Sequence, residues 1–518
     1  MSIKIPRIKI LGPIIVFFIL FFMIKTCSRQ ESEFDSDTIA YVGGRKISIK
    51  DFQVNYELGF TFLKKKNDSK YSYLDYMINE VLLMQEGYRL GFNKSERVKI
   101  QEDQLLKALL IEEFFKKKVD NNITITDEEI KAAITKSTVK WKLKYWIESN
   151  SGQAFEIYNS MRESGYTKVV QKMLVNNYEE KRSLKDLETG YLTWLDIPPE
   201  LLEQIKNLGI GEISKPIALE GVYFILQITN ITRSGISEYD YQNTYNRFKQ
   251  ILFSRKQKER TAKFVAEFMN PKNVIAKGDE FKILVGALTE WKQQSSSSDN
   301  FLERVLKATR NEPALMELKN NLEKPFITFD HEVWTVKEFL NRFDPHFIKD
   351  KPSYKQLFQK QLKHQLAITI RNYFFVKEAI NLGLDKSEEV VNQLKAWSDK
   401  WVYEETRHFY TMNIKINNSK ARKYFDDHVN HYVSEHGKQP EFNEVLDKVK
   451  RDAYLEQAKR LLEGKIEQIK KNTVVRINKA VLDSITVSDS DKSTTIDVIL
   501  LKSSGKLAYP TVDPAWGL

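Results

Sequence analysis

The first regular pattern along the chain is an alternation of apolar and polar residues over 38–49, with the period of two that is typical of β-strands. Gly43 and Gly44 interrupt this alternation and predict a two-residue turn between two short strands. Beyond Asp51, apolar residues recur three and four positions apart as far as Val119, with a break at Gly91. The pattern therefore predicts a β-hairpin followed by two or three long helices.

The pattern changes between residues 125 and 233. Thr126 and Glu129 have the spacing of a capping box and predict the start of one more helix. From Lys140 the sequence WKLKYWI alternates, a helix is predicted over 153–164, and an aromatic strand is predicted over 222–228. We therefore predict a small α+β domain at residues 140–233.

Two stretches of the second half of the chain resemble stretches of the first half. Residues 382–390 (LGLDKSEEV) match 90–98 (LGFNKSERV), and residues 334–339 (WTVKEF) resemble 47–52 (ISIKDF). Such self-similarity indicates a duplicated module, and two copies are too few for a solenoid. We predict two hairpin-plus-helices modules, at 38–139 and 326–487. A helical connector with a serine-rich linker is predicted at 234–325, and a poorly ordered tail at 488–518.

Composition and charge narrow the chemistry. The chain has 518 residues, enough for several domains, and its net charge of +11 arises from acidic and basic residues mixed along the whole length. Its single cysteine, Cys27, excludes an intrachain disulfide and a cysteine-based zinc site. All 7 histidines lie beyond residue 330, and the sequence has no phosphate-binding loop, nucleophile elbow or zinc-protease motif. We therefore predict no cofactor, no metal and no nucleic-acid partner.

The N-terminal sequence predicts the compartment. Basic residues precede an apolar run at 10–24, which is too short for a full membrane span and resembles the core of a signal peptide. Cys27 stands where a bacterial lipoprotein would be cut and lipidated, although Lys25 departs from the usual signal. Residues 1–27 are thus a signal peptide with a lipid anchor, or an uncleaved membrane anchor, and residues 28–37 a polar tether. Both alternatives place the rest of the chain in the cell envelope, on the periplasmic side.

Four segments within 140–233 carry a family resemblance: 190–194 (GYLTW), 198–201 (PPEL), 208–216 (LGIGEISKP) and 221–225 (GVYFI). In this order and spacing they resemble a parvulin-type (PpiC-like) peptidyl-prolyl isomerase domain. An export signal, a hairpin-plus-helices module and a parvulin-like domain together resemble the layout of SurA-type and PpiD-type periplasmic foldases. The resemblance implies an α+β protein in which mostly helical, duplicated SurA-N-like chaperone modules flank a small parvulin-like domain.

The resemblance also identifies the positions where the site departs from the family. The two family histidines fall on Tyr145, or Lys144 if the register slips by one, and on Tyr223 or Phe224. No catalytic residue is therefore assigned. The resemblance still implies an apolar peptide-binding pocket, for which the expected residues are Tyr145, Trp146, Trp194, Tyr223 and Phe224.

Three functions remain open from the sequence. The first is an envelope chaperone that binds unfolded exported or outer-membrane proteins, with a parvulin-like domain that binds more than it catalyses. The second is an active peptidyl-prolyl isomerase, in which Tyr145 and Tyr223 hydrogen-bond each other in place of the histidines. The third is an envelope assembly subunit with one fixed partner.

Overall fold

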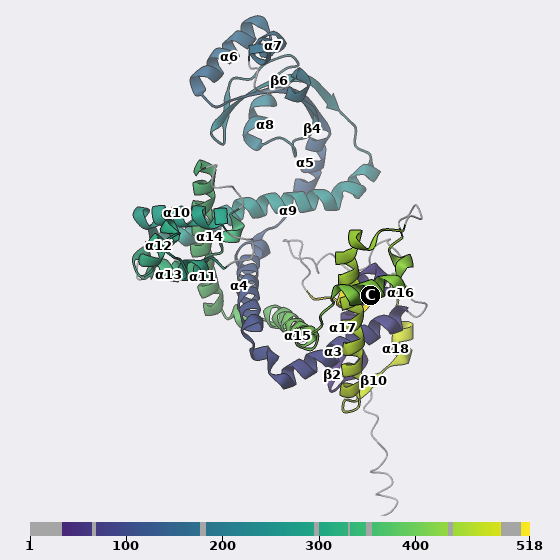
Figure 1. Cartoon of the computed structure of the whole chain (residues 1–518). Helices are drawn as coiled ribbons and strands as arrows, with labels where there is room; N and C mark the ends of the chain where they lie inside the picture. Colours follow the sequence, from purple (N-terminus) through teal and green to yellow (C-terminus); the bar gives the residue numbers. More distant parts are fainter. Residues whose placement is uncertain are drawn as a thin grey trace, which may run out of the picture. The chain divides into compact units, whose positions relative to one another are not determined.

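A computed structural model describes residues 34–64, 69–176, 183–294, 300–329, 332–348, 355–433, 439–487 and 509–517 (Figure 1). The predicted anchor with Cys27 lies outside these ranges, as do residues 28–33 of the tether. No helix in the described ranges is both long enough and apolar enough to cross a membrane. The chain divides into two compact units, with unit 1 formed by residues 1–110 and 378–518 and unit 2 by residues 111–377.

Unit 1 is mostly helical and contains a three-stranded antiparallel sheet of order β10-β1-β2. Most of its helices pack on this sheet around an apolar core with aromatic and aliphatic residues from both ends of the chain. The elements are β1 (Thr38–Val42), β2 (Arg45–Ser48), α2 (Ile49–Leu58), α3 (Ser69–Leu90), α15 (Glu388–Thr411), α16 (Asn418–Asp427), α17 (Leu446–Lys470), β10 (Val475–Ile477) and α18 (Lys479–Ser484). A separate, smaller cluster around Phe425 and Val449 holds α16 against α17. Helix α4 (Glu96–Lys118) leads from unit 1 into unit 2.

Unit 2 contains the sheet domain and a second helical part. The sheet domain comprises β3 (Val139–Glu148), α6 (Ser151–Ser164), α7 (Tyr166–Asn176), β4 (Glu188–Leu192), α8 (Pro199–Ile205), β5 (Ile217–Leu219) and β6 (Val222–Arg233). The helical part comprises α5 (Asp127–Ser137), α9 (Glu238–Met269), β7 (Ile275–Ala276), α10 (Gly278–Gln294), α11 (Phe301–Leu306), α12 (Pro313–Asn320), β8 (Pro325–Thr328), β9 (Val333–Thr335), α13 (Val336–Leu340) and α14 (Lys355–Asn381). The α+β fold class is confirmed.

The predicted duplication is confirmed by matching local structure in the two copies. Each copy begins with a hairpin, β1–β2 in the first and β8–β9 in the second, and continues directly into a helix. The helix begins with a capping box in both cases, formed by Ser48 with Asp51 and by Thr335 with Glu338. A capping box satisfies two backbone donors that would otherwise lack partners at the helix start.

The second long helix of each copy follows the same glycine turn. Gly91 has φ of 84° and Gly383 has φ of 70°, both in the left-handed region that glycine adopts at little cost. A single 3-10 turn follows each glycine, and the next helix, α4 in the first copy and α15 in the second, begins directly after a serine. Both turns lie in unit 1, and each joins two successive long helices of its copy.

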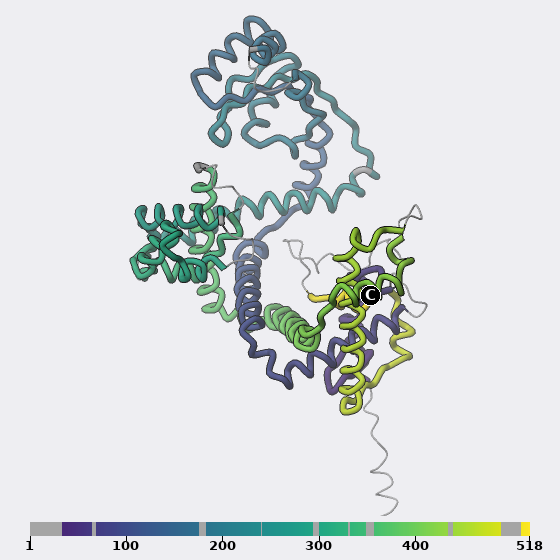
Figure 2. The backbone as a smooth tube through the Cα atoms, viewed as in Figure 1, coloured from purple at the N-terminus to yellow at the C-terminus, as the bar shows by residue number. Residues whose placement is uncertain are grey.

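The copies exchange their ends. β10, from the end of the second copy, pairs with β1 of the first copy, with Ala40 opposite Ile477. In the structure the first copy extends beyond its predicted limit at residue 139, because β7 follows the long helix α9 as β10 follows α17. β7 pairs with β8 of the second copy, with Ile327 opposite Ala276. The two registers are equivalent, and in unit 1 the first and last parts of the chain lie side by side (Figure 2). Each sheet is therefore completed by the other copy, whereas the sequence pattern predicts contiguous modules.

The long helices are exchanged in the same way. In unit 1, α15 of the second copy packs on α3 of the first so closely that a Cβ on Gly87 would lie 2.1 Å from Oγ1 of Thr406. In unit 2, the ring of Phe114 on α4 packs against the ring of Phe375 on α14, with 5.3 Å between their centroids. Each unit therefore combines the beginning of one copy with the end of the other.

The sheet domain spans residues 139–233, close to the predicted limits of 140–233. Its four strands are antiparallel in the order β4-β3-β6-β5. Helix α8 covers one face through a cluster around Leu143, Leu201 and Leu226. Helices α6 and α7 cover the other face through a cluster around Met161 and Tyr166.

Candidate functional site

The structure places Tyr145 and Tyr223 on opposite faces of the sheet. Tyr145 is paired with Leu226 and Tyr223 with Glu148, an offset of three residues along antiparallel strands. Because side chains alternate along a strand, an odd offset sends the two tyrosines to different faces. The hydroxyl of Tyr145 instead donates to the carbonyl oxygen of Asp186 at 3.1 Å. The expected hydrogen bond between the two tyrosines does not form.

Phe224 lies on the face of Tyr145, and Trp146 lies on the opposite face. Phe224 forms a cross-strand row with Ile147 on β3 and Ile217 on β5. Ile147 is 43% exposed and Phe224 is half-buried, so this row presents apolar surface at the end of the sheet. Trp146 joins the cluster beneath α6 and α7, and its buried indole nitrogen has no hydrogen-bond partner among the residues that the structure describes.

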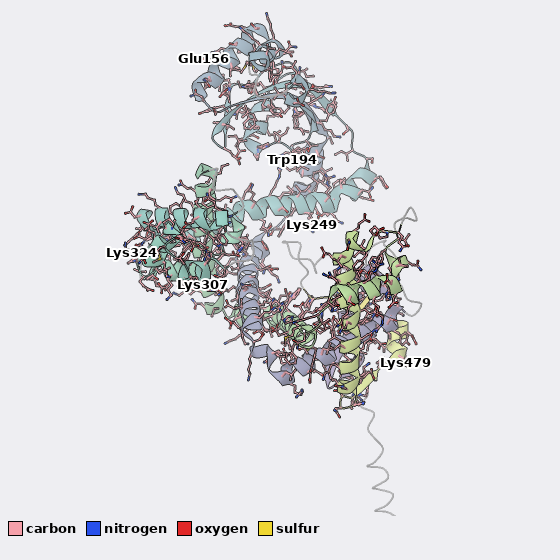
Figure 3. The ribbon with its side chains drawn as sticks, in the orientation of Figure 1. Glu156, Trp194, Lys249, Lys307, Lys324 and Lys479 are labelled. Atoms are coloured by element: carbon pink, nitrogen blue, oxygen red, sulfur yellow. The ribbon has the colours of Figure 1, made fainter. Side chains whose placement is uncertain are left out.

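Trp194 packs against helices α5 and α9, outside the sheet domain. Its indole nitrogen donates to the carbonyl oxygen of Ala133 on α5 at 3.0 Å, and the guanidinium of Arg255 on α9 lies 4.2 Å from its ring (Figure 3). It is 9% exposed and packs among residues of α5 and α9. Trp194 thus attaches the sheet domain to these helices, and the five expected side chains do not line one common pocket.

The interior polar groups of the sheet domain have structural roles. Tyr166 donates to the carbonyl oxygen of Tyr145 at 2.6 Å, and burial raises the pKa of its phenol, so it stays neutral. Residues 139–233 contain no histidine and no cysteine. The apolar contact row of the domain therefore includes neither a histidine nor a cysteine.

Sequence reasoning missed a second site, in the helical part of unit 2. Two cavities of about 900 and 790 Å³ adjoin there and share Ala276 and Leu366. The first is lined by α10 and α14, the second by the end of α9 and by α14, and β7 borders both. We call β7 and these two cavities the β7 groove. Its apolar lining includes Phe281, Val285 and Phe358 in one cavity, and Val265, Met269, Val274 and Ile370 in the other.

The β7 groove includes the edge of a sheet. β7 is the outer strand in the order β7-β8-β9, and Ile275 on it is 63% exposed. An edge strand presents backbone donors and acceptors with which an extended peptide can pair, and adjacent apolar cavities can accept its side chains. The groove therefore has the geometry to hold an extended apolar segment.

The rim of the β7 groove is basic. Lys363 lies 5.9 Å from the ring of Phe281, and the guanidinium of Arg371 donates to the side-chain oxygen of Asn372 at 2.8 Å. Within the described part of the chain, neither Lys363 nor Arg371 forms an ion pair with a carboxylate. Burial lowers the pKa of Arg371, which indicates a partly desolvated positive charge. Acidic residues in a bound segment would complement this rim.

Comparisons with known proteins give structural neighbours only. No protein-family model and no curated protein matches the chain. Among solved structures, the chain is similar to the peptidylprolyl isomerase PrsA of Bacillus anthracis, with 16% identity, a TM-score of 0.21, and coverage of 36% of this chain and 89% of that one. It is also similar to a structure from the study of PEB4 and Cj1289, described as SurA-like chaperones of Campylobacter jejuni, with 16% identity, a TM-score of 0.22, and coverage of 46% and 100%. The foldase PrsA of Streptococcus pneumoniae matches at 15% identity and a TM-score of 0.23, with coverage of 43% and 88%.

These neighbours are foldases and SurA-like chaperones, the group that the sequence motifs indicate. Their TM-scores near 0.2 describe a partial likeness.

Two tryptophans of the sheet domain provide a matched test of the roles described above. Trp194→Phe removes an indole that donates a hydrogen bond and stacks with Arg255, and it should cost about 1–2 kcal/mol of unfolding free energy. Trp146→Phe removes a buried donor that has no partner, so the loss should be smaller by about 1 kcal/mol or more. Denaturant unfolding of the two variants measures the difference. Equal losses would contradict the assignment of Trp194 as the attachment residue.

Proposed function

We propose that this protein is a cell-envelope folding factor that binds extended, unfolded segments of exported proteins. The observation that carries this proposal is the β7 groove, an open apolar groove along a sheet edge with a basic rim. Unfolded chains expose apolar side chains and unpaired backbone groups together, and this groove complements both. Outer-membrane proteins are the client class that the family resemblance implies.

The sheet domain contributes a second contact surface. The row of Ile147, Phe224 and Ile217 presents apolar side chains next to the strand ends. Rotation about a prolyl peptide bond has a barrier of about 18–20 kcal/mol, and an isomerase lowers it by holding the twisted amide in a shaped, desolvated site. The domain lacks the family histidines and separates the two tyrosines that replace them. We propose that it binds peptides with little or no catalysis.

The proposed location rests on the N-terminal sequence. Residues 1–27 carry the features of an export signal that ends in a lipid or membrane anchor, with Cys27 as the lipidation site. A folding factor held at the membrane surface would meet exported chains as they emerge unfolded.

Client capture can be tested with two variants that differ only in the sheet edge they change. Ile275 on β7 and Val333 on β9 are both exposed, and both are paired with Thr328 in the same sheet. Ile275→Asp should lower suppression of the aggregation of an unfolded outer-membrane protein at least five-fold, because it places a charge in the apolar groove. Val333→Asp should leave suppression unchanged. Light scattering at equimolar ratio measures both.

Three results would overturn the proposal, two from this experiment and one from the recovery of partners from membranes. The full chain could leave the aggregation of the client unchanged, or the two variants could lose activity equally. A single partner recovered in fixed ratio from membranes, with no unfolded clients, would instead support an assembly subunit. Circular dichroism of both variants serves as the folding control.

The isomerase alternative has its own test. The full chain should not accelerate cis–trans isomerisation of a proline-containing tetrapeptide above the thermal rate. The double variant Tyr145→Phe, Tyr223→Phe should behave identically, since these hydroxyls do not meet. Acceleration by the full chain that is lost in the double variant would establish a tyrosine-dependent isomerase and contradict the proposed binding role.

A further inference from the structure

The C-terminal segment of unit 1 occupies a groove of its own. The sequence predicts a poorly ordered tail at residues 488–518, and 488–508 lie outside the described residues. Residues 510–517, however, pack against α2, α3 and α15, with Val512 and Trp516 only 2% and 4% exposed. We call this segment the tail and the surface beneath it the tail groove. The prediction of disorder is wrong for this segment, because its apolar side chains are buried.

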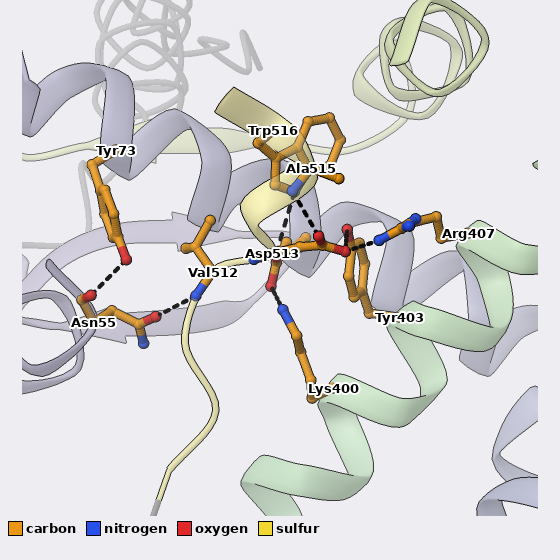
Figure 4. A network of polar contacts seen from close by, with 10 residues as sticks. Asn55, Tyr73, Lys400, Tyr403, Arg407, Val512, Asp513, Ala515 and Trp516 are labelled. Carbon is orange, nitrogen blue, oxygen red and sulfur yellow. Dashed lines mark hydrogen bonds and ion pairs between the residues drawn. The ribbon is translucent and has the colours of Figure 1, made fainter. Parts of the chain in front are cut away.

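The tail groove recognises three features of the tail (Figure 4). The side-chain oxygen of Asn55 accepts a hydrogen bond from the backbone nitrogen of Val512 at 2.9 Å. The carboxylate of Asp513 accepts a hydrogen bond from the hydroxyl of Tyr403 at 3.1 Å and pairs with the guanidinium of Arg407. These contacts fix the backbone at Val512 and the acidic residue that precedes the 3-10 turn of Pro514–Gly517.

The third feature is the indole of Trp516. Its ring stacks on Tyr76 with a centroid distance of 6.3 Å and an angle of 13°. Its nitrogen lies 3.3 Å from Oε1 of Glu80, which also accepts from the backbone nitrogen of Asp513 at 2.6 Å. Lys400 pairs with the other oxygen of Glu80 at 2.7 Å. The carboxylate of Glu80 thus accepts hydrogen bonds from both the backbone and the tryptophan of the tail.

The groove would be left incomplete without a ligand of this kind. Departure of the tail would remove two of the three donors named above for Glu80, the backbone nitrogen of Asp513 and the indole nitrogen of Trp516. Burial raises the pKa of Glu80, and the positive charge of Lys400 lowers it. It would also remove the carboxylate that Arg407 pairs with. Partly buried charges without partners are costly, so the empty groove favours any segment that restores the same contacts.

We propose that the tail groove is a peptide-binding site, and that the tail is its resident internal ligand. The external ligands are segments of unfolded clients that carry an acidic residue three positions before a tryptophan, as Asp513 precedes Trp516, and that can form the same 3-10 turn between them. Such segments displace the tail and take over its contacts with Glu80 and Arg407. This inference deepens the proposed function and rests on it for the identity of the ligands.

The test measures binding of a fluorescent peptide with the sequence of residues 508–518 to the full chain and to variants of it. In the double variant Asp513→Ala, Trp516→Ala the internal ligand is weakened, so the labelled peptide should bind at least ten-fold more tightly than to the unchanged chain. Pro514→Ser is the matched control, because the Pro514 side chain is exposed, and it should bind like the unchanged chain. A peptide with alanine in place of its aspartate and tryptophan should bind to none of them.

Displacement then decides between a binding site and a structural element. An unfolded client with the acidic–tryptophan spacing should release the labelled peptide from the double variant. Equal peptide affinity in all chains, or no release by any client, would overturn the proposal. A double variant that loses cooperative thermal unfolding would show that the tail is part of the core, and would also overturn it.

Two further outcomes distinguish this proposal from two alternatives, a dimer of the chain and a peptide site without chaperone function. A concentration-dependent dimer of the unchanged chain that the labelled peptide dissociates would assign the groove to the tail of a second copy, against the proposal. A chain that binds the peptide as expected, yet never suppresses client aggregation, would refute the proposed chaperone function and leave the tail groove as a peptide site.

Discussion

The exchange of strands between the two copies is the constraint on which the rest of the structure depends. A two-stranded hairpin is marginal alone, and each hairpin here gains its third strand from the opposite copy, β10 for the first and β7 for the second. The long helices are exchanged as the strands are. Helix α15 of the second copy packs on α3 of the first copy so closely that only glycine fits at residue 87. Neither unit can therefore be completed by a single copy. Both candidate grooves are built on these exchanged elements.

The two grooves use the exchange differently. In unit 2 the exchanged strand β7 stays at the sheet edge, with apolar cavities beside it and a basic rim. In unit 1 the seam between α3 and α15 holds the tail, whose aspartate and tryptophan contact charged residues of both helices. The β7 groove fits apolar segments of varied sequence. The tail groove selects segments with an acidic residue three positions before a tryptophan. Each groove by itself is suited to the proposed binding of unfolded segments.

Local patterns predicted local structure well. The capping box at Thr126 and Glu129 forms, with the Glu129 nitrogen 3.3 Å from the threonine hydroxyl. The matching stretches around Gly91 and Gly383 predicted the duplication, because a left-handed turn needs glycine in each copy. The exchange could not be predicted, since a strand of two residues such as β7 carries no periodic signal and its partner is set by tertiary packing. For the same reason the contacts of Trp194 with α5 and α9 had no signature in the sequence.

Hydrogen exchange of the full chain with and without an unfolded client tests the central claim most directly, because it reports where a bound segment protects the backbone. The account predicts slower exchange at β7 and at the adjoining ends of α9 and α14, where the groove would bury the edge strand. Protection confined to the sheet domain at 139–233, or no protection anywhere in unit 2, would contradict it.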